Sequence, residues 1–192
     1  MDTKTLLNDY YARAYKRWRI EKEKAGKDIV GEEYELMRKK FWTQHGFKAQ
    51  SEKIAGYAAD LVVRTKTGRI VVIEEDKAHY VDSCFLDRFV MNAGRVLQHY
   101  IDLEIPEEDI PYVSLSCMTS YRLYEQKLKD NKRMFSTELQ EIMGKKVKYF
   151  PICAHDRVQK GKYFKNTDVN FEFSDDLILN QAQFVESLKE IL

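Results

Sequence analysis

A short run of acidic residues and one lysine is the part of this sequence best suited to chemistry. Residues 69–77 read RIVVIEEDK, so a mostly branched apolar stretch passes directly into three acids and a lysine. Side chains alternate along a β-strand, which places Glu75 and Lys77 on one face and Glu74 and Asp76 on the other. One face of this predicted strand therefore offers a carboxylate beside an ammonium group.

A further acid opens the preceding apolar segment. Asp60 stands before Leu-Val-Val at 61–63, and the turn Thr-Lys-Thr-Gly joins this segment to the strand that ends at Lys77. The two segments predict a β-hairpin in which Asp60 and Glu75 meet across the sheet. Carboxylates that converge with a lysine form an oxygen-ligand site for a hard cation such as Mg²⁺. Such a site suits phosphodiester cleavage, because the cation activates water and neutralises charge on the phosphate.

Hydrophobic periodicity predicts the elements that must position these residues. Their order is two helices, three strands, a long helix, and then strand, helix, strand and helix. This order suits one α/β domain over residues 1–192, with a central mixed β-sheet flanked by helices. The expected helices are 4–25, 31–45, 82–103, 120–143 with a break near 130–131, and 176–192, and the expected strands are 47–51, 57–64, 69–77, 111–118 and 146–153.

Composition and motifs exclude several classes of protein. Apolar residues make up 44% and charged residues 33% of the chain, which is typical of a folded globular protein. No Gly-rich turn follows a predicted strand, which argues against a nucleotide-binding loop. The three cysteines are too far apart for a zinc-site spacing. No apolar run is long enough to span a membrane and the first residues lack a signal-type core, so we expect a cytoplasmic protein without a membrane partner.

The hairpin and its acids resemble the motif of the PD-(D/E)xK nuclease superfamily. That motif is an acid, a hairpin, then Asp or Glu, any residue, and Lys. Asp60, fourteen intervening residues and Glu75-Asp76-Lys77 match it. Ala59 stands where the motif has proline, which removes a conformational restraint but no ligand.

The upstream segment extends the resemblance to about residues 31–80. A predicted helix carries Glu35, and Gly46-Phe47 begins eleven residues later. This spacing is similar to the amino-terminal block of archaeal Holliday-junction resolvases and their restriction-enzyme relatives. The resemblance implies a restriction endonuclease-like fold, and it implies that Glu35 joins the metal site. Glu32 and Glu33 compete with Glu35 for that role.

The resemblance also assigns roles to the residues of the hairpin. Asp60 and Glu75 are expected to bind Mg²⁺, for which Mn²⁺ is expected to substitute, and Lys77 is expected to assist the attacking water. Asp60, Glu75 and Lys77 are thus the predicted catalytic residues. Glu74 competes with Glu75 as the ligand, and Glu75 is preferred because it alone lies two residues before Lys77.

Charge is unevenly distributed along the chain. The net charge is only +1, which gives no general reason to expect a polyanionic partner. Residues 145–165 nevertheless contain seven basic residues, one acid and several aromatics, a mixture found on nucleic-acid-binding surfaces. An ordinary solvated basic face would have the same composition. Arg88 and Arg95, seven apart on one predicted helix, are further candidates, so the predicted DNA-binding residues are Arg88, Arg95, Lys160, Lys162 and Lys165.

These features predict a Mg²⁺-dependent endonuclease that cuts double-stranded DNA, most simply a type II restriction enzyme. Because cutting both strands at a palindrome needs two sites related by a two-fold axis, we expect a homodimer. One alternative is a structure-selective nuclease, either a Holliday-junction resolvase or a repair enzyme. Another is a catalytically silent DNA-binding module of the same fold. The purely structural alternative is a solvated acid cluster at an exposed strand end.

Overall fold

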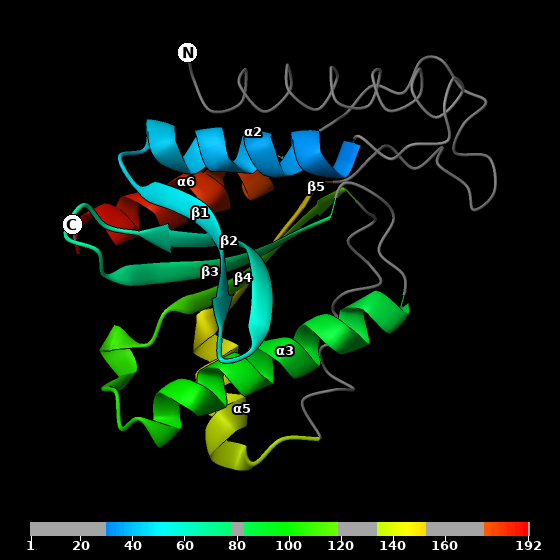
Figure 1. Ribbon diagram of the computed structural model, residues 1–192, viewed down its shortest axis with the longest axis vertical. Coiled ribbons are helices and arrows are strands. Elements are labelled where there is room, and N and C mark those ends of the chain that lie inside the picture. Colours follow the sequence, from blue (N-terminus) through cyan, green and yellow to red (C-terminus); the bar gives the residue numbers. More distant parts are fainter. Residues whose placement is uncertain (1–29, 78–82, 119–133, 153–174, 192) are drawn as a thin grey trace.

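The computed structural model describes residues 30–77, 83–118, 134–152 and 175–191. Within these residues, a five-stranded sheet has helices on both faces (Figure 1). The predicted α/β class, with a mixed sheet flanked by helices, is confirmed. The elements are α2 (Val30–Gln44), β1 (Lys48–Ile54), β2 (Tyr57–Arg64), β3 (Ile70–Lys77), α3 (Ser83–Asp102), the short 3₁₀ helix η1 (Glu107–Asp109), β4 (Tyr112–Met118), α5 (Thr137–Lys146), β5 (Val147–Ile152) and α6 (Asp175–Lys189).

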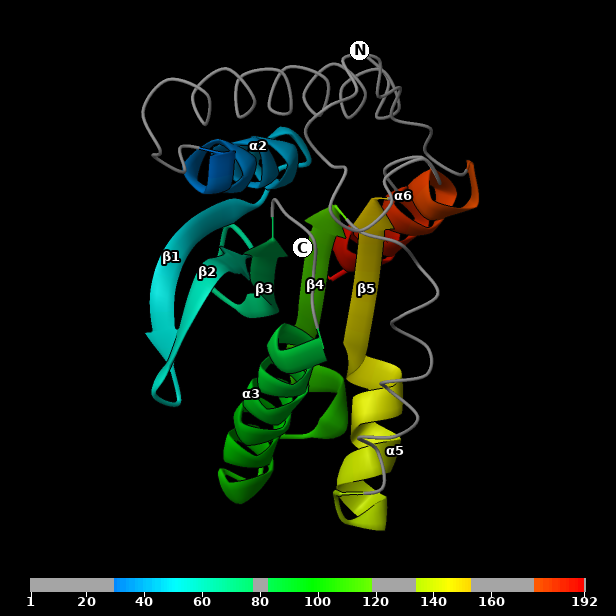
Figure 2. The same cartoon turned by 90° about the vertical axis from the view of Figure 1, so that its right-hand side faces the viewer.

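The sheet combines an antiparallel and a parallel half. Its strand order is β1-β2-β3-β4-β5, in which β1 pairs antiparallel with β2 and β2 pairs antiparallel with β3. The pairs β3–β4 and β4–β5 are parallel, so helical segments must return the chain between them. Figure 2 shows α3 and α5, which lie on these two connections, side by side on one face of the sheet. The carboxyl ends of β3, β4 and β5 consequently share one edge of the sheet.

Turn chemistry sets the register of the β2–β3 hairpin. Gly68 has a positive φ of 97°, which a residue without a Cβ adopts at little cost. Its amide donates to the Thr65 carbonyl at 3.1 Å, and the Thr65 amide donates to the Arg69 carbonyl at 2.9 Å. The turn therefore pairs Val63 with Val72 and Leu61 with Glu74. The predicted hairpin is confirmed, with strand bounds within one residue of those expected.

The core lies in two layers, one on each face of the sheet. The layer under α2 and α6 contains an apolar stripe of α2, at the spacing expected of an amphipathic helix. The other layer contains the wide apolar face of α3 and residues of α5. Figure 1 shows α2 and α6 on one side of the sheet and α3 and α5 on the other. The α2 stripe consists of Tyr34, Met37, Phe41 and Trp42, all 2% exposed or less.

Two predicted helices differ in their bounds. The expected helix 176–192 is observed as α6, which ends at Lys189. The expected helix 120–143 is described only from residue 134 onward, and there the helix begins at Thr137 and continues to Lys146. The Ser136 side chain accepts a hydrogen bond from the Leu139 amide and so starts the helix as an N-cap. The predicted helix 4–25 lies outside the described residues.

None of the described helices combines the length and the apolar character needed to cross a membrane.

Candidate active site

The candidate site lies where β2 and β3 separate. The last paired residues of these strands are Leu61 and Glu74, and the earlier part of β2 continues alongside β1. At the point of separation, the Asp76 amide donates a hydrogen bond to Asp60 Oδ2 at 2.7 Å. A side-chain carboxylate thus takes the place of a backbone carbonyl of the neighbouring strand. This hydrogen bond holds Asp60 beside the end of β3.

Glu75 faces the same region as Asp60. The Tyr57 hydroxyl, at the start of β2, donates a hydrogen bond to Glu75 Oε2. Burial raises the pKa of the Glu75 carboxyl to about 7, and the negative charge of Asp60 adds to the effect. The hydrogen bond from Tyr57 and the charge of Lys77 oppose this increase. Glu75 therefore titrates near neutral pH, unlike an ordinary surface glutamate.

Glu35 brings a third carboxyl from α2. Burial raises its pKa, and the next largest effect comes from Asp60. Burial also raises the pKa of Asp60, against the opposing effects of its hydrogen bond from the Asp76 amide and of Lys77. Glu35 in turn contributes to the raised pKa of Glu75. We refer to Glu35, Asp60 and Glu75 as the acidic cluster, since each of these carboxyls has a raised pKa.

Lys77 lies between the acidic cluster and α3. Its charge lowers the pKa of both Asp60 and Glu75, although burial prevails at each. The Lys77 ammonium lies 4.8 Å from the centre of the Phe85 ring in the first turn of α3, within the usual range of a cation–π contact. The Arg88 guanidinium lies 6.0 Å from the same ring. Lys77 is therefore the cationic group that acts on Asp60 and Glu75, and Arg88 lies near the same aromatic ring as Lys77.

The two predicted arginines differ in their distance from the cluster. Arg88 is exposed and shares the Phe85 ring with Lys77. Arg95 is also exposed but lies seven residues farther along α3, which is about 10 Å along the helix axis. The predicted DNA-binding residues Lys160, Lys162 and Lys165 lie outside the described residues.

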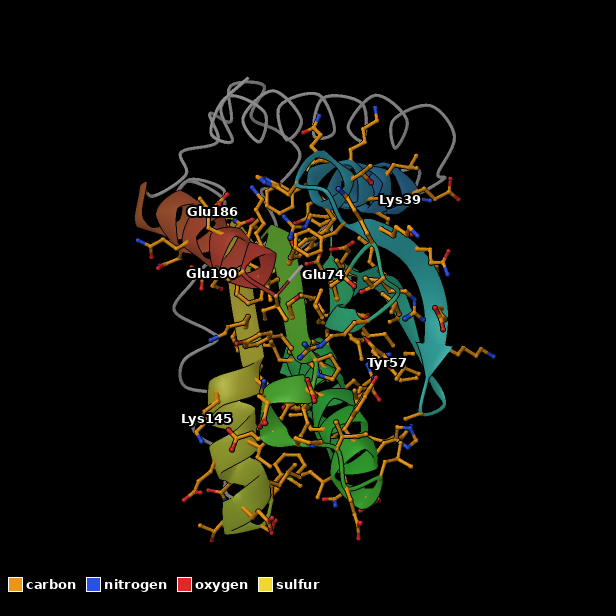
Figure 3. The ribbon with its side chains drawn as sticks, turned by 90° about the vertical axis from the view of Figure 1, so that its left-hand side faces the viewer. Lys39, Tyr57, Glu74, Lys145, Glu186 and Glu190 are labelled. Carbon is orange, nitrogen blue, oxygen red and sulfur yellow. The ribbon has the colours of Figure 1, made fainter. Side chains whose placement is uncertain are left out.

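Glu74 belongs to the opposite face of the sheet. Its carboxylate is fully buried and accepts hydrogen bonds from Arg38 Nε at 2.8 Å and Arg38 Nη2 at 2.9 Å. In Figure 3, Glu74 lies beneath α2, whereas Tyr57 lies lower, toward α3. Both oxygens of Glu74 are thus engaged, and Glu75 is the glutamate of β3 that lies beside Asp60. Of the two residues that compete with Glu35, Glu32 is exposed on α2, and the side chain of Glu33 is outside what the structure describes.

The donor atoms of the acidic cluster suit a hard divalent cation. Carboxylate oxygens are the ligands that Mg²⁺ prefers, and a bound cation would favour the charged forms of carboxyls whose pKa values are raised mainly by burial. Among the described residues, however, no three Asp, Glu, His or Cys side chains already lie in the arrangement of a metal site. The carboxylate oxygens of the cluster therefore fit a hard cation by their chemistry, although they are not gathered into a metal site in this structure.

Two residues of this region were not anticipated from the sequence. Arg38 interrupts the apolar stripe of α2, and a charged residue inside such a stripe is a signal for a buried ion pair. Tyr57 gives no comparable signal, because its contact with Glu75 depends on how strongly β2 twists away from β3. Both residues act on β3, one on each of its faces.

Comparison with known proteins found no matching family model, no matching curated protein and no matching solved structure.

Proposed function

We propose that this protein is a Mg²⁺-dependent endonuclease that hydrolyses phosphodiester bonds of duplex DNA. The observation that carries the proposal is the acidic cluster beside Lys77, at the point where β2 and β3 separate. Three carboxyls with raised pKa values and an adjacent ammonium group are costly to keep together unless a cation and an anion bind there. A divalent cation with a phosphate group satisfies both requirements.

Each residue of the site has a distinct proposed role. Asp60 and Glu75 supply oxygen ligands, Glu35 supplies a third, and Mn²⁺ is expected to replace Mg²⁺. The cation, when bound, neutralises charge on the phosphate and lowers the pKa of a water molecule. Lys77 donates hydrogen bonds that orient the attacking water and stabilise negative charge in the transition state. The Asp76 amide keeps Asp60 in place, and Tyr57 holds one oxygen of Glu75.

The proposed substrate is duplex DNA, and the proposed class is a type II restriction enzyme. Lys77 and Arg88 both lie near the Phe85 ring, and Arg88 is proposed to contact the phosphate beside the one that is cut. Arg95 extends the same exposed face of α3. The resemblance of the hairpin motif to PD-(D/E)xK nucleases supports the same substrate.

Cleavage assays with matched variants test this proposal. The protein is incubated with Mg²⁺ and either supercoiled plasmids of varied sequence or a four-way DNA junction, with excess EDTA as the metal-free control. Asp60→Asn should abolish cleavage while Ca²⁺-supported DNA binding persists. Lys77→Ala should lower the single-turnover rate by about 10² without weakening binding. Glu108→Gln, an exposed acid in η1 near the opposite end of β3, should behave like the wild type.

The products distinguish the three candidate functions. Discrete plasmid fragments support the restriction enzyme, and cleavage of the junction alone supports a structure-selective nuclease. Binding without cleavage under all conditions supports a silent DNA-binding module. Full activity in excess EDTA would contradict the metal-dependent mechanism, and a loss confined to DNA affinity in Lys77→Ala would contradict the assigned role of this lysine.

A further inference from the structure

A fully buried ionic group lies directly behind the acidic cluster, on the other face of β3. Arg38 of α2 binds both oxygens of Glu74, and its Nη1 donates to Gln181 Oε1 of α6 at 3.0 Å. Arg38 Nε also lies 3.9 Å from Asp76 Oδ1, and the side chains of Arg38, Glu74 and Asp76 are all 0% exposed. We refer to Arg38, Glu74, Asp76 and Gln181 as the buried ionic cluster.

Neighbouring side chains complete the hydrogen bonding of Glu74. The indole N–H of Trp42 donates to Glu74 Oε1 at 3.2 Å, and the Ser114 hydroxyl donates to Oε2 at 3.0 Å. The cluster thus connects α2, β3, β4 and α6. Well-packed apolar residues of similar volume usually stabilise a core as well as a buried ion pair does. The directional contacts of the cluster therefore call for an explanation other than stability alone.

The buried ionic cluster and the acidic cluster are carried by the same two elements. On β3, Glu74 and Asp76 alternate with Glu75 and Lys77, so each cluster takes one face of the strand. On α2, Glu35 and Arg38 are three residues apart, which makes them neighbours on the helix surface. Any shift of α2 along β3 would therefore move Glu35 relative to Asp60 and Glu75.

Apolar packing alone would hold α2 less specifically. The stripe that includes Met37 and Phe41 buries apolar area, but this attraction has no preferred direction. The two-point contact between Arg38 and Glu74 has a fixed geometry, since the planar guanidinium matches both carboxylate oxygens. A further directional contact, between the Tyr34 hydroxyl and Ser116 Oγ at 2.7 Å, holds the preceding turn of α2 against β4.

We propose that Arg38 is a positioning residue, which fixes α2 in one register on β3 so that Glu35 meets Asp60 and Glu75 to complete the metal site. The inference rests on the proposed function, because the position of α2 on β3 matters in this way only if the acidic cluster binds a cation. Arg38 is buried and does not touch the substrate. It acts through Glu35.

A double-mutant cycle tests this role. Removing Arg38 alone would leave Glu74 buried without its ion-pair partner and endanger folding. The informative background is therefore Arg38→Met/Glu74→Gln, which removes both charges of the ion pair; the amide oxygen can still accept from Trp42, and the amide nitrogen can donate to the Ser114 hydroxyl. Met37→Ala is the matched control background, because Met37 is buried on the same helix outside the buried ionic cluster. The Ca²⁺ affinity of each folded protein is measured by calorimetry, with and without Glu35→Gln.

We expect Glu35→Gln to lose its effect on Ca²⁺ affinity only in the Arg38→Met/Glu74→Gln background. In the wild-type and Met37→Ala proteins, Glu35→Gln should weaken Ca²⁺ binding about 10-fold or more. In the Arg38→Met/Glu74→Gln background, the same substitution should change the affinity less than about 2-fold, because Glu35 no longer reaches the site. An undiminished effect of Glu35→Gln in that background would overturn the proposal.

A metal-free measurement separates this inference from the proposed function. The side-chain carboxyl ¹³C signal of Glu35 should respond to Asp60→Asn in the wild-type protein, since the two carboxyls interact. The response should disappear in the Arg38→Met/Glu74→Gln background and persist in Met37→Ala. If the protein neither binds metal nor cuts DNA, the proposed function fails while this measurement still decides the role of Arg38. If the Glu35 signal still responded to Asp60→Asn in the Arg38→Met/Glu74→Gln background, that role would be contradicted.

Discussion

Glu75 holds its carboxyl group between a tyrosine hydroxyl and two other carboxyls. Because burial and the charge of Asp60 raise its pKa from about 4.5 to about 7, the folded protein keeps this proton in a range where the unfolded chain releases it. The folded state therefore loses stability as the pH rises from about 4.5 to about 7, and the loss stays constant above pH 7. A difference of this size corresponds to about 3 kcal/mol.

Replacing Glu75 with glutamine should remove this penalty. Without metal, Glu75→Gln should raise the free energy of unfolding by up to about 3 kcal/mol at pH 8 and change it little at pH 4.5. The amide oxygen still accepts the hydrogen bond from Tyr57. Urea unfolding of the variant and the wild type at the two pH values measures the effect. Equal pH profiles for Glu75→Gln and the wild type would show that Glu75 titrates as an ordinary glutamate.

At the scale of elements, α3 links the candidate site to the proposed DNA surface. Its first turn places Phe85 against Lys77, and its exposed side carries Arg88 and Arg95. The amino-terminal half of α3 therefore faces both the reacting phosphate and the flanking DNA backbone in the proposed complex. On the opposite face of the sheet, α2 carries Glu35 and Arg38, so the two helices contribute to the site in different ways.

The arginines of α3 should set part of the salt dependence of DNA binding. Replacing both Arg88 and Arg95 with glutamine should reduce the slope of log affinity against log salt by about 2, because two phosphate contacts are lost. Lys66→Gln is the control, since this exposed lysine lies in the turn at the far end of the β2–β3 hairpin. Salt titrations of Ca²⁺-supported binding make the comparison. An unchanged slope in the double variant would remove α3 from the DNA interface.

At the scale of the whole molecule, one acidic cluster is present in the described part of each chain, while duplex cleavage requires two strands to be cut. The chain's net charge of +1 gives little long-range attraction to DNA. A symmetric pair of chains on the DNA would place one cluster against each strand and would double the number of phosphate contacts.

A homodimer should convert supercoiled plasmid directly to the linear form. Nicked circles should accumulate only when the protein is diluted or mixed with excess Asp60→Asn chains, since mixed dimers cut one strand. Gel electrophoresis measures the supercoiled, nicked and linear forms of the plasmid over time. Sedimentation with a DNA duplex should give two chains per duplex. A monomer on DNA that only nicks it would favour the structure-selective or repair nuclease.

The sequence by itself determined the elements around the site and the meeting of its two strand acids. Local periodicity predicts α2, α3 and the β2–β3 hairpin within one residue of their observed bounds, because side-chain spacing and turn residues act over short distances. Once the turn at 65–68 sets the register, Asp60 and Glu75 must approach each other. The alternation of side chains also separates Glu75 and Lys77 from Glu74 and Asp76.

Only the tertiary structure decided which partners each face of β3 receives. The burial of Glu74 against Arg38, the hydrogen bond from Tyr57 to Glu75 and the approach of Glu35 to Asp60 join residues that are 18 to 36 positions apart. These contacts depend on how α2 crosses the sheet and on how far β2 diverges from β3. Helical or strand periodicity carries no information on either quantity, because both result from the packing of complete elements against one another.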